Sequence, residues 1–358
     1  MPNLDSNLIN RGIFNNSNIN NSDSIVLGTL QQGQIDQKVE PRALTTELNS
    51  QAAESIKTNL DKKLFAHIHA DHAIRGTFLE GGNTVRNAKF LSDCLDLIDI
   101  SMETKEILKT AFNSSTSCED AQVASKVKNL LPGCSLLVSG GHAVLYEFIK
   151  KTDHTYDIYL YTTGVGISAY HPQKQKEGIP FYKAVIKFEN VLPEELDLVN
   201  QKDSSCFFQY LAELGHSRSN EKKSIDALYG KGFGHLAKKL VGVQEDHFLF
   251  VKVQYSGTCS WRVLQAFALK TFGNFALYKK YVFDLKLVTL SLFFKKCTEE
   301  CDLESCMLLE EAATNLLRSA AKLYHAENPD TTILSEEKAA CAHATLQEIL
   351  QKLPDLKS

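Results

Sequence analysis

Residues 247–272 read HFLFVKVQYSGTCSWRVLQAFALKTF, and this stretch contains the sharpest change of pattern in the chain. The apolar run from His247 to Gln254 is typical of a β-strand, and Ser256-Gly257 predicts a tight turn after it. From Cys259 the apolar residues recur at helical spacing, which predicts a helix that begins at this cysteine. A strand that leads through a short turn into a helix indicates an α+β fold.

A second strand-rich region lies upstream of this stretch. The runs CSLLVSGGHAVLYEFIKK (134–151) and YDIYLYTTGVG (156–166) flank a polar turn at 152–155, which predicts a β-hairpin. The run YKAVIKFENV (182–191) predicts a further strand. Together with 247–254, these runs predict a mainly antiparallel central sheet.

Helical spacing dominates the rest of the chain. Residues 1–45 are rich in Asn, Ser and Gln and have few apolar anchors, so we expect this segment to be disordered. The expected organisation is then a helical subdomain at 46–130, an α+β core at 131–272 and a C-terminal helical layer at 273–358. Further helices are expected over 115–131, stopped by Pro132-Gly133, and over 192–214.

The expected position of Cys259 suits a nucleophile. Free N–H groups and the positive end of the helix dipole stabilise a thiolate at a helix start, and the same N–H groups can donate to an oxyanion. Gln254, at the end of the preceding strand, is placed to add a side-chain donor. A thiolate needs a base, and His142, behind two glycines at the head of an apolar strand, is the candidate. The alternative is a packed cysteine and a surface histidine without chemistry.

The order of these residues resembles that of the ubiquitin-like-protein proteases and adenain-type cysteine peptidases (clan CE), whose fold bacterial effector deubiquitinases and acetyltransferases share. That family places His at a strand start, an acid or Asn at the end of the next strand, then Gln, then Cys at a helix start. His142, the hairpin, Gln254 and Cys259 follow this order. The resemblance implies a papain-like or adenain-like core, no cofactor, and cleavage of peptide or isopeptide bonds. Ala143 and Ser260 depart from the family, which commonly has Trp and Gly there.

The family's acid has no direct counterpart in this chain. Asp157 is a carboxylate in the right strand. If the hairpin turns at 153–154, however, Asp157 lies opposite residue 150, roughly 26 Å from His142 at about 3.3 Å per residue. The family position aligns best with Thr162, whose hydroxyl or neighbouring carbonyl could orient the imidazole. A Cys–His dyad, an orienting group from elsewhere, and a decayed enzyme are left open.

Other motifs were weighed against this interpretation. AHIHADH (66–72) matches the H-x-H-x-D-H zinc pattern of metallo-β-lactamase-type hydrolases, but it follows an amphipathic helical pattern rather than a buried strand, which favours a polar helix face. Cys297, Cys301 and Cys306 lack the second pair of a structural zinc site, which favours helix packing. GKGFGH (230–235) follows no strand and so does not predict a phosphate loop. The aromatic run at 278–294 predicts a core-facing helix.

Bulk properties narrow the class of protein. The net charge of −4 and the pI near 6.3 give no electrostatic reason to expect nucleic acid or an anionic membrane as the main partner. No apolar run approaches the length of a membrane span, and the N-terminus lacks a signal-peptide core, which predicts cytosolic synthesis. Nine cysteines without a regular framework favour a reducing compartment.

The leading hypothesis is a cytoplasmic thiol hydrolase that acts on ubiquitin or ubiquitin-like conjugates. The Asn-rich first segment and the helical flanks would suit a bacterial effector secreted into a host cell. Two alternatives are an effector-type acyltransferase that uses the same Cys–His site and an inert protein-interaction module.

Overall fold

The computed structural model describes residues 50–69, 83–140, 144–164, 167–199, 206–216, 228–241, 249–252, 259–299, 303–324 and 333–357. The chain divides into two compact units, Met1–Thr46 and Glu47–Ser358, and every described residue belongs to the second. No helix among the described residues is long and apolar enough to cross a membrane.

The second unit is built around a six-stranded sheet of order β1-β2-β3-β4-β7-β8. Its strands are β1 (Thr116–Ser117), β2 (Ser135–Gly140), β3 (Val144–Lys150), β4 (Tyr156–Thr162), β7 (Val185–Val191) and β8 (Leu240–Val241). Strands β1 and β2 are parallel, and the other neighbouring strands are antiparallel. The structure therefore confirms an α+β fold with a mainly antiparallel central sheet.

The β3–β4 pair confirms the predicted hairpin, but the run 134–151 forms two strands rather than one. It turns back between Gly140 and Val144, which lie opposite each other in the β2–β3 ladder. Gly140 is required at this point, because an added Cβ would lie 2.9 Å from the buried ring of Tyr146. The close approach of backbone to ring explains why the strand ends at a glycine.

A second sheet of order β5-β6-β9 adjoins the first. It consists of β5 (Gln173–Lys176), β6 (Ile179–Lys183) and β9 (Phe250–Val251). The β5–β6 turn has positive φ at both central residues, Glu177 (52°) and Gly178 (75°), as a type I′ turn requires. The β5–β6 hairpin was not predicted from the sequence. Within the strand predicted at 247–254, the structure describes residues 249–252, of which Phe250 and Val251 form β9.

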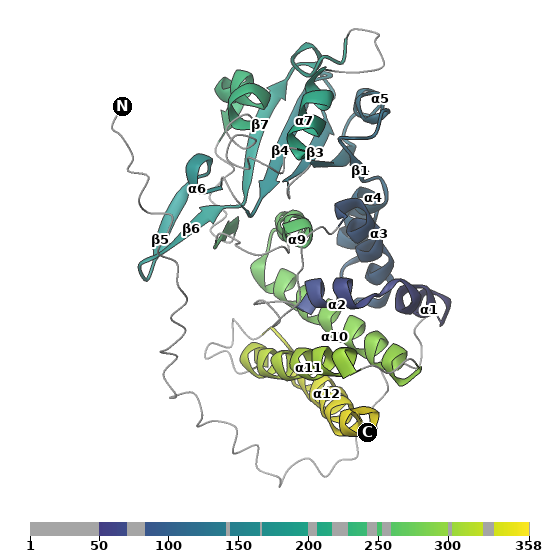
Figure 1. Ribbon diagram of the computed structural model, residues 1–358. Coiled ribbons are helices and arrows are strands. Elements are labelled where there is room, and N and C mark those ends of the chain that lie inside the picture. The colour runs from purple at the N-terminus through teal and green to yellow at the C-terminus, as the bar shows by residue number, and fades with distance from the viewer. Residues whose placement is uncertain are drawn as a thin grey trace. The chain divides into compact units, whose positions relative to one another are not determined.

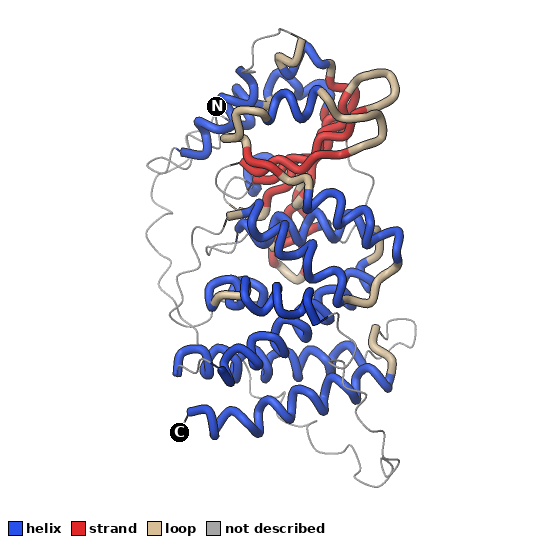
Figure 2. The backbone as a smooth tube through the Cα atoms, turned by 90° about the vertical axis from the view of Figure 1, so that its right-hand side faces the viewer, coloured by secondary structure: helices blue, strands red, loops and turns tan. Residues whose placement is uncertain are grey.

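Alternating side chains divide the large sheet between two hydrophobic clusters. Ile158 and Leu160 face the cluster of α5 (Val123–Lys128), η2 (Pro193–Leu196), α7 (Cys206–His216), η3 (Leu228–Gly232) and η4 (Gly234–Lys239). Tyr161, one residue along, joins the cluster of α9 (Cys259–Phe272). The period of two thus buries both faces of the sheet. Figure 2 shows helices on both sides of the strands.

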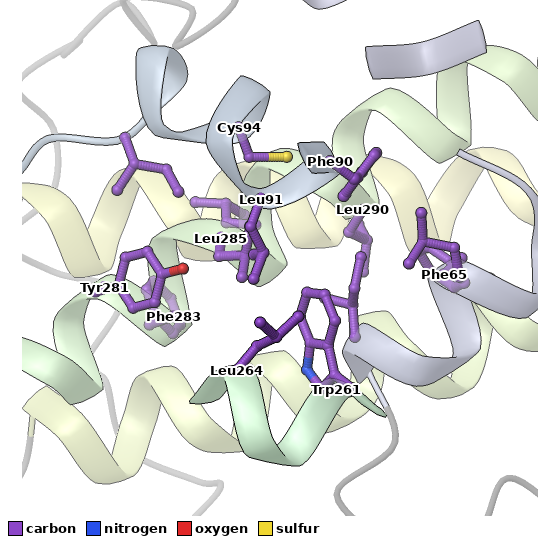
Figure 3. Packing of buried hydrophobic residues seen from close by; sticks show 14 of the residues in the cluster. Phe65, Phe90, Leu91, Cys94, Trp261, Leu264, Tyr281, Phe283, Leu285 and Leu290 are labelled. Carbon is purple, nitrogen blue, oxygen red and sulfur yellow. The ribbon is translucent and has the colours of Figure 1, made fainter. Parts of the chain in front are cut away.

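The cluster on the α9 side continues into a layer of helices, α1 (Ser50–Asn59), α2 (Lys62–His69), α3 (Thr84–Cys94), η1 (Leu95–Leu97), α4 (Met102–Asn113), α10 (Phe275–Glu299), α11 (Leu303–Tyr324) and α12 (Glu336–Lys357). Figure 3 shows Trp261 and Leu264 of α9 packed among side chains of α3 and α10. The predicted C-terminal helices and the core-facing aromatic run are confirmed, because Tyr281, Phe283 and Phe293 are buried.

Two helices predicted from the sequence, at 115–131 and 192–214, are wrong over these ranges. Residues 115–131 contain β1 and only the short α5, because the Asp120 carboxylate accepts from the Thr116 hydroxyl (2.7 Å) and the Gln122 N–H (2.8 Å) and so holds a turn. The helix predicted at 192–214 is interrupted after η2, where Asp197 adopts φ 54°. A left-handed residue cannot continue a right-handed helix.

The AHIHADH segment is helical as far as it is described, since α2 ends at His69. His67 and His69 are both buried, and two residues along a helix they point about 200° apart. The His69 ring stacks on Phe65, and its Nε2 lies 3.1 Å from the Thr289 hydroxyl. Asp71 and His72 lie outside the described residues. Cys297 and Cys306 are buried within α10 and α11, where helix packing was expected, and Cys301 is not described.

Candidate active site

The end of β4 and the start of β3 lie side by side where the strands of the large sheet end, and this row of strand ends is the edge discussed for the site. Thr162, the last residue of β4, lies opposite Val144, the first residue of β3. Gly140 and Val144, the described residues on either side of 141–143, both lie at this edge. His142 belongs to this connection and lies outside the described residues.

Main-chain hydrogen bonds join this edge to the strand that precedes α9. The Thr162 N–H donates to the Ala184 carbonyl (3.0 Å), and the Ala184 N–H donates to the Leu249 carbonyl (2.9 Å). Leu249 directly precedes β9, and the chain then runs through 253–258 to Cys259. Gln254 lies in that segment, outside the described residues. The end of β4 is therefore two hydrogen bonds away from the chain that leads to the predicted nucleophile.

The contacts of α9 show which way it crosses the sheet. Near its C-terminal end, the Lys270 ammonium lies 2.7 Å from the Glu147 carboxylate in the middle of β3. One turn earlier, Phe267 makes an edge contact with Tyr161, whose partner across the ladder is Leu145. Going backwards along α9 therefore means going toward Val144 and Thr162. Cys259 is eight residues, about 12 Å, before Phe267, and α9 lies between the strands and α10 (Figure 1).

The first turn of α9 is anchored by its neighbours. Ser260 is buried, and its hydroxyl accepts from the Asn87 side-chain amide of α3 (3.2 Å). Trp261 is 1% exposed, and its buried Nε1 has no hydrogen-bond partner among the described residues. Of Cys259 itself the structure describes the backbone, as the first residue of the helix. The first N–H groups of a helix lack partners within the helix, which is the environment that a thiolate or oxyanion uses.

The orienting position at the end of β4 contains two buried threonines. Thr162 is 3% exposed and Thr163 is 4% exposed. By strand alternation Thr162 shares the α7 side of the sheet with Leu160, and Val144, its partner across the ladder, belongs to the same cluster. Thr163 directly follows the last residue of the strand.

Asp157 lies far from this edge, as the sequence argument required. It pairs with Ile149, within one position of the expected partner, and its carboxylate lies 3.0 Å from the Lys187 ammonium. Five residues of β3 separate Ile149 from Val144, which corresponds to roughly 17 Å. Asp157 is therefore far from the edge at which β3 begins.

A second histidine near this edge was not recognised in the sequence. The His171 ring is buried, with Nδ1 at 2.5 Å from the Lys183 carbonyl and Nε2 at 2.6 Å from the Tyr229 hydroxyl. Because a carbonyl can only accept, Nδ1 carries the proton and Nε2 accepts from Tyr229. Burial lowers the pKa of His171 to about 4. With both nitrogens occupied, His171 is structural and does not compete with His142 as a base.

The other described cysteines differ in how well they could react. Burial raises the pKa of the Cys118 thiol to about 12 and that of Cys94 well above its ordinary value. Cys134 is exposed. Since the thiolate is the nucleophile, Cys94 and Cys118 are poor nucleophiles at neutral pH. Cys134 is the surface thiol against which the reactivity of Cys259 can be measured.

A charged group supports the interface between α9 and the sheet. The Glu147 carboxylate accepts from the Tyr161 hydroxyl (2.5 Å) and pairs with Lys270. The Lys270 ammonium also lies 3.6 Å from the centre of the Tyr159 ring. Two strands and the helix thus meet at one ion pair, which favours a single placement of α9 on the sheet.

No protein-family model, curated protein or solved structure matches this chain.

Proposed function

We propose that the protein is a cysteine-dependent hydrolase of papain-like or adenain-like fold that cleaves peptide or isopeptide bonds. Cys259 is the nucleophile, and His142 is the general base and then the general acid. Gln254 and the first N–H groups of α9 stabilise the oxyanion. Thr162 or its neighbour Thr163 orients the imidazole.

The reaction follows from these assignments. His142 takes the proton of the Cys259 thiol, and the thiolate attacks the scissile carbonyl carbon to form a tetrahedral oxyanion. The intermediate collapses as the C–N bond breaks, and the imidazolium gives its proton to the leaving amine. Water, deprotonated by His142, then hydrolyses the thioester and releases the acid and the free thiol.

The observation that carries this proposal is the direction of α9. The contacts of Lys270 and Phe267 orient α9 so that its N-terminal end is directed toward the edge at which β3 begins and β4 ends. Val144, two positions after His142, and Thr162 mark that edge. Helix α9 is directed toward it from Lys270 to Cys259, which supports a meeting of the histidine and the cysteine although 117 positions separate them. A helix start beside two strand ends is the arrangement that a thiol hydrolase needs.

The substrate class proposed is a ubiquitin or ubiquitin-like conjugate, and the setting is the cytoplasm, including that of a host cell into which an effector is secreted. The resemblance in residue order supports this part of the proposal. An acyltransferase forms the same thioester but transfers its acyl group to an amine or hydroxyl instead of water.

Thiol reactivity tests the proposal. The intact protein is treated with limiting iodoacetamide across pH 5 to 9, and the modified cysteines are located by peptide mapping. We expect Cys259 to react faster than the exposed Cys134 at neutral pH and to lose this advantage in His142→Ala. A ubiquitin vinyl sulfone probe tests the substrate class separately.

The outcomes separate the hypotheses. Equal labelling of Cys259 and Cys134, or indifference of Cys259 to His142→Ala, refutes the catalytic pair and favours an inert interaction module. A reactive Cys259 that ignores the ubiquitin probe keeps the mechanism and rejects that substrate. Thioester formation without hydrolysis, followed by transfer to an added amine, favours the acyltransferase.

A further inference from the structure

One face of the β5-β6-β9 sheet combines lysines with large apolar side chains. The ladder places Lys174 opposite Phe181 and Lys176 opposite Ile179, and it places Phe250 opposite Lys183 on the same face. Residues opposite each other in a ladder point to the same side. No carboxylate belongs to the strand residues of this face, although the whole chain has a net charge of −4. We call Lys174, Lys176, Ile179, Phe181, Phe250 and Lys252 the basic face.

The side chains of this face are within reach of solvent. Ile179 is 41% exposed, Lys176 and Lys252 are exposed, and the two phenylalanines are partly buried. The Lys174 ammonium lies 4.3 Å from the centre of the Phe250 ring, and that of Lys252 lies 5.7 Å from the centre of Phe181. An ammonium group thus lies over each phenylalanine ring, which places positive charge on side chains that are otherwise apolar.

Strand β5 also has an open backbone edge, since among the described residues its only ladder partner is β6. The two-residue turn makes Lys176 and Ile179 a hydrogen-bonded pair, so the N–H and C=O groups of Gln173 and Gln175 point away from β6. Pro180 fits this register, because it lies opposite Gln175, where no N–H is needed. The outer edge of β5 can therefore accept another strand.

We propose that this edge and the basic face bind an extended polypeptide segment that carries acidic side chains at alternate positions. The segment adds to β5 as a further strand. Its acidic residues then lie beside Lys174 and Lys176, where carboxylates meet ammonium groups, and the residues between them point to the opposite face of the sheet. Binding requires no chemistry at Cys259, so this inference is independent of the proposed hydrolase.

Charge and geometry favour an acidic strand over other occupants. Pairing of β5 with β5 of a second copy would bring lysines together, and like charges across a ladder are destabilising. A nucleic acid would need free ring faces for base stacking, but lysines already cover Phe181 and Phe250, and its backbone cannot use the strand edge. A polypeptide with carboxylates satisfies both the edge and the charge.

The test measures binding of short fluorescein-labelled peptides to the intact protein by anisotropy. The probe alternates glutamate with valine or leucine, its reference replaces every glutamate by lysine, and a labelled oligo-dT strand represents nucleic acid. Two substitutions address the edge. Gln175→Pro removes the outward N–H, and its control Gln175→Ala keeps that N–H. Circular dichroism and the unfolding midpoint establish that each variant is folded.

The charge is tested by the double variant Lys174→Glu/Lys176→Glu. Its control, Lys89→Glu/Lys322→Glu, makes the same change in net charge at exposed positions on α3 and α11. We expect the acidic peptide to bind, and binding to weaken about tenfold or more in Gln175→Pro and in the β5 charge reversal. The two controls should stay within about threefold of the original affinity.

Three results would overturn the inference. One is failure of the acidic peptide to bind, another is an equal loss of affinity in both charge reversals, and the third is tighter binding of the oligo-dT strand. If Gln175→Pro unfolds the hairpin, the comparison of the two charge reversals decides the matter alone.

Discussion

Replacement of Lys270 by methionine should destabilise the fold far more than the loss of an ordinary surface ion pair. The Glu147 side chain is 6% exposed, and Lys270, at 2.7 Å, is its counter-ion. Methionine keeps the aliphatic packing of Lys270 but leaves a carboxylate in a nearly water-free site with the Tyr161 hydroxyl as its remaining described partner.

The burial of the two side chains predicts the order in which these substitutions lower the free energy of unfolding. Removing one partner of a buried ion pair costs about 3–5 kcal/mol, because the other charge is left uncompensated. Glu147→Gln should cost less, about 1–2 kcal/mol, since glutamine still accepts from Tyr161 and the 21% exposed Lys270 side chain can reach water. The double variant should resemble Glu147→Gln, so the coupling energy should equal the cost of Lys270→Met in magnitude, about 3–5 kcal/mol.

Urea unfolding at neutral pH, followed by circular dichroism, measures these free energies. The control pair is Lys352 and Glu348 on α12, which are 2.6 Å apart with side chains 57% and 61% exposed. Lys352→Met should change the free energy of unfolding by less than about 0.5 kcal/mol. If Lys270→Met costs no more than Lys352→Met, or if the double variant is the sum of the two single ones, the reasoning about a buried pair is refuted.

Three further predictions follow from individual contacts. Gly140→Ala should destabilise the protein by about 1–3 kcal/mol, because its Cβ would lie 2.9 Å from the Tyr146 ring, whereas Gly164→Ala, with nothing within 4 Å, should cost less; equal losses in thermal unfolding would contradict this. Because folding lowers the pKa of His171 from 6.5 to about 4, its contribution of about 3 kcal/mol should be complete above pH 6.5 and fade as the pH falls toward 4. In His171→Gln, urea titrations across that window should have a flatter pH dependence, and an unchanged slope would reject the assignment. Trp261→Phe removes the unpartnered indole N–H and should stay within about 1 kcal/mol of the original stability, whereas Trp261→Ala should cost about 3–5 kcal/mol; similar losses would show that the indole nitrogen is satisfied.

Local pattern was sufficient for several elements of this fold. The helix that begins at Cys259, the β3–β4 hairpin and the long C-terminal helices follow from hydrophobic periodicity and turn residues within short windows, which involve only neighbours in sequence. The position of Asp157 far from the start of β3 also followed, because strand register is arithmetic once a hairpin is recognised.

Local pattern was insufficient where a single residue or a distant partner decided the outcome. Asp197 stops a helix by adopting positive φ, and the β5–β6 hairpin turns at Glu177-Gly178, which lacks the Asn or Asp that commonly signals such a turn. Neither feature changes the hydrophobic period that the sequence argument used.

The order of residues by itself determined which candidate groups the chain contains: a cysteine at a helix start, a histidine behind two glycines, and strands of the right length between them. Tertiary structure decided the rest. It set the direction of α9 through Lys270 and Glu147, which are 123 positions apart, and the burial of Thr162 and His171. These depend on contacts between segments distant in sequence, and periodicity within one segment carries no information about which partner another segment will supply.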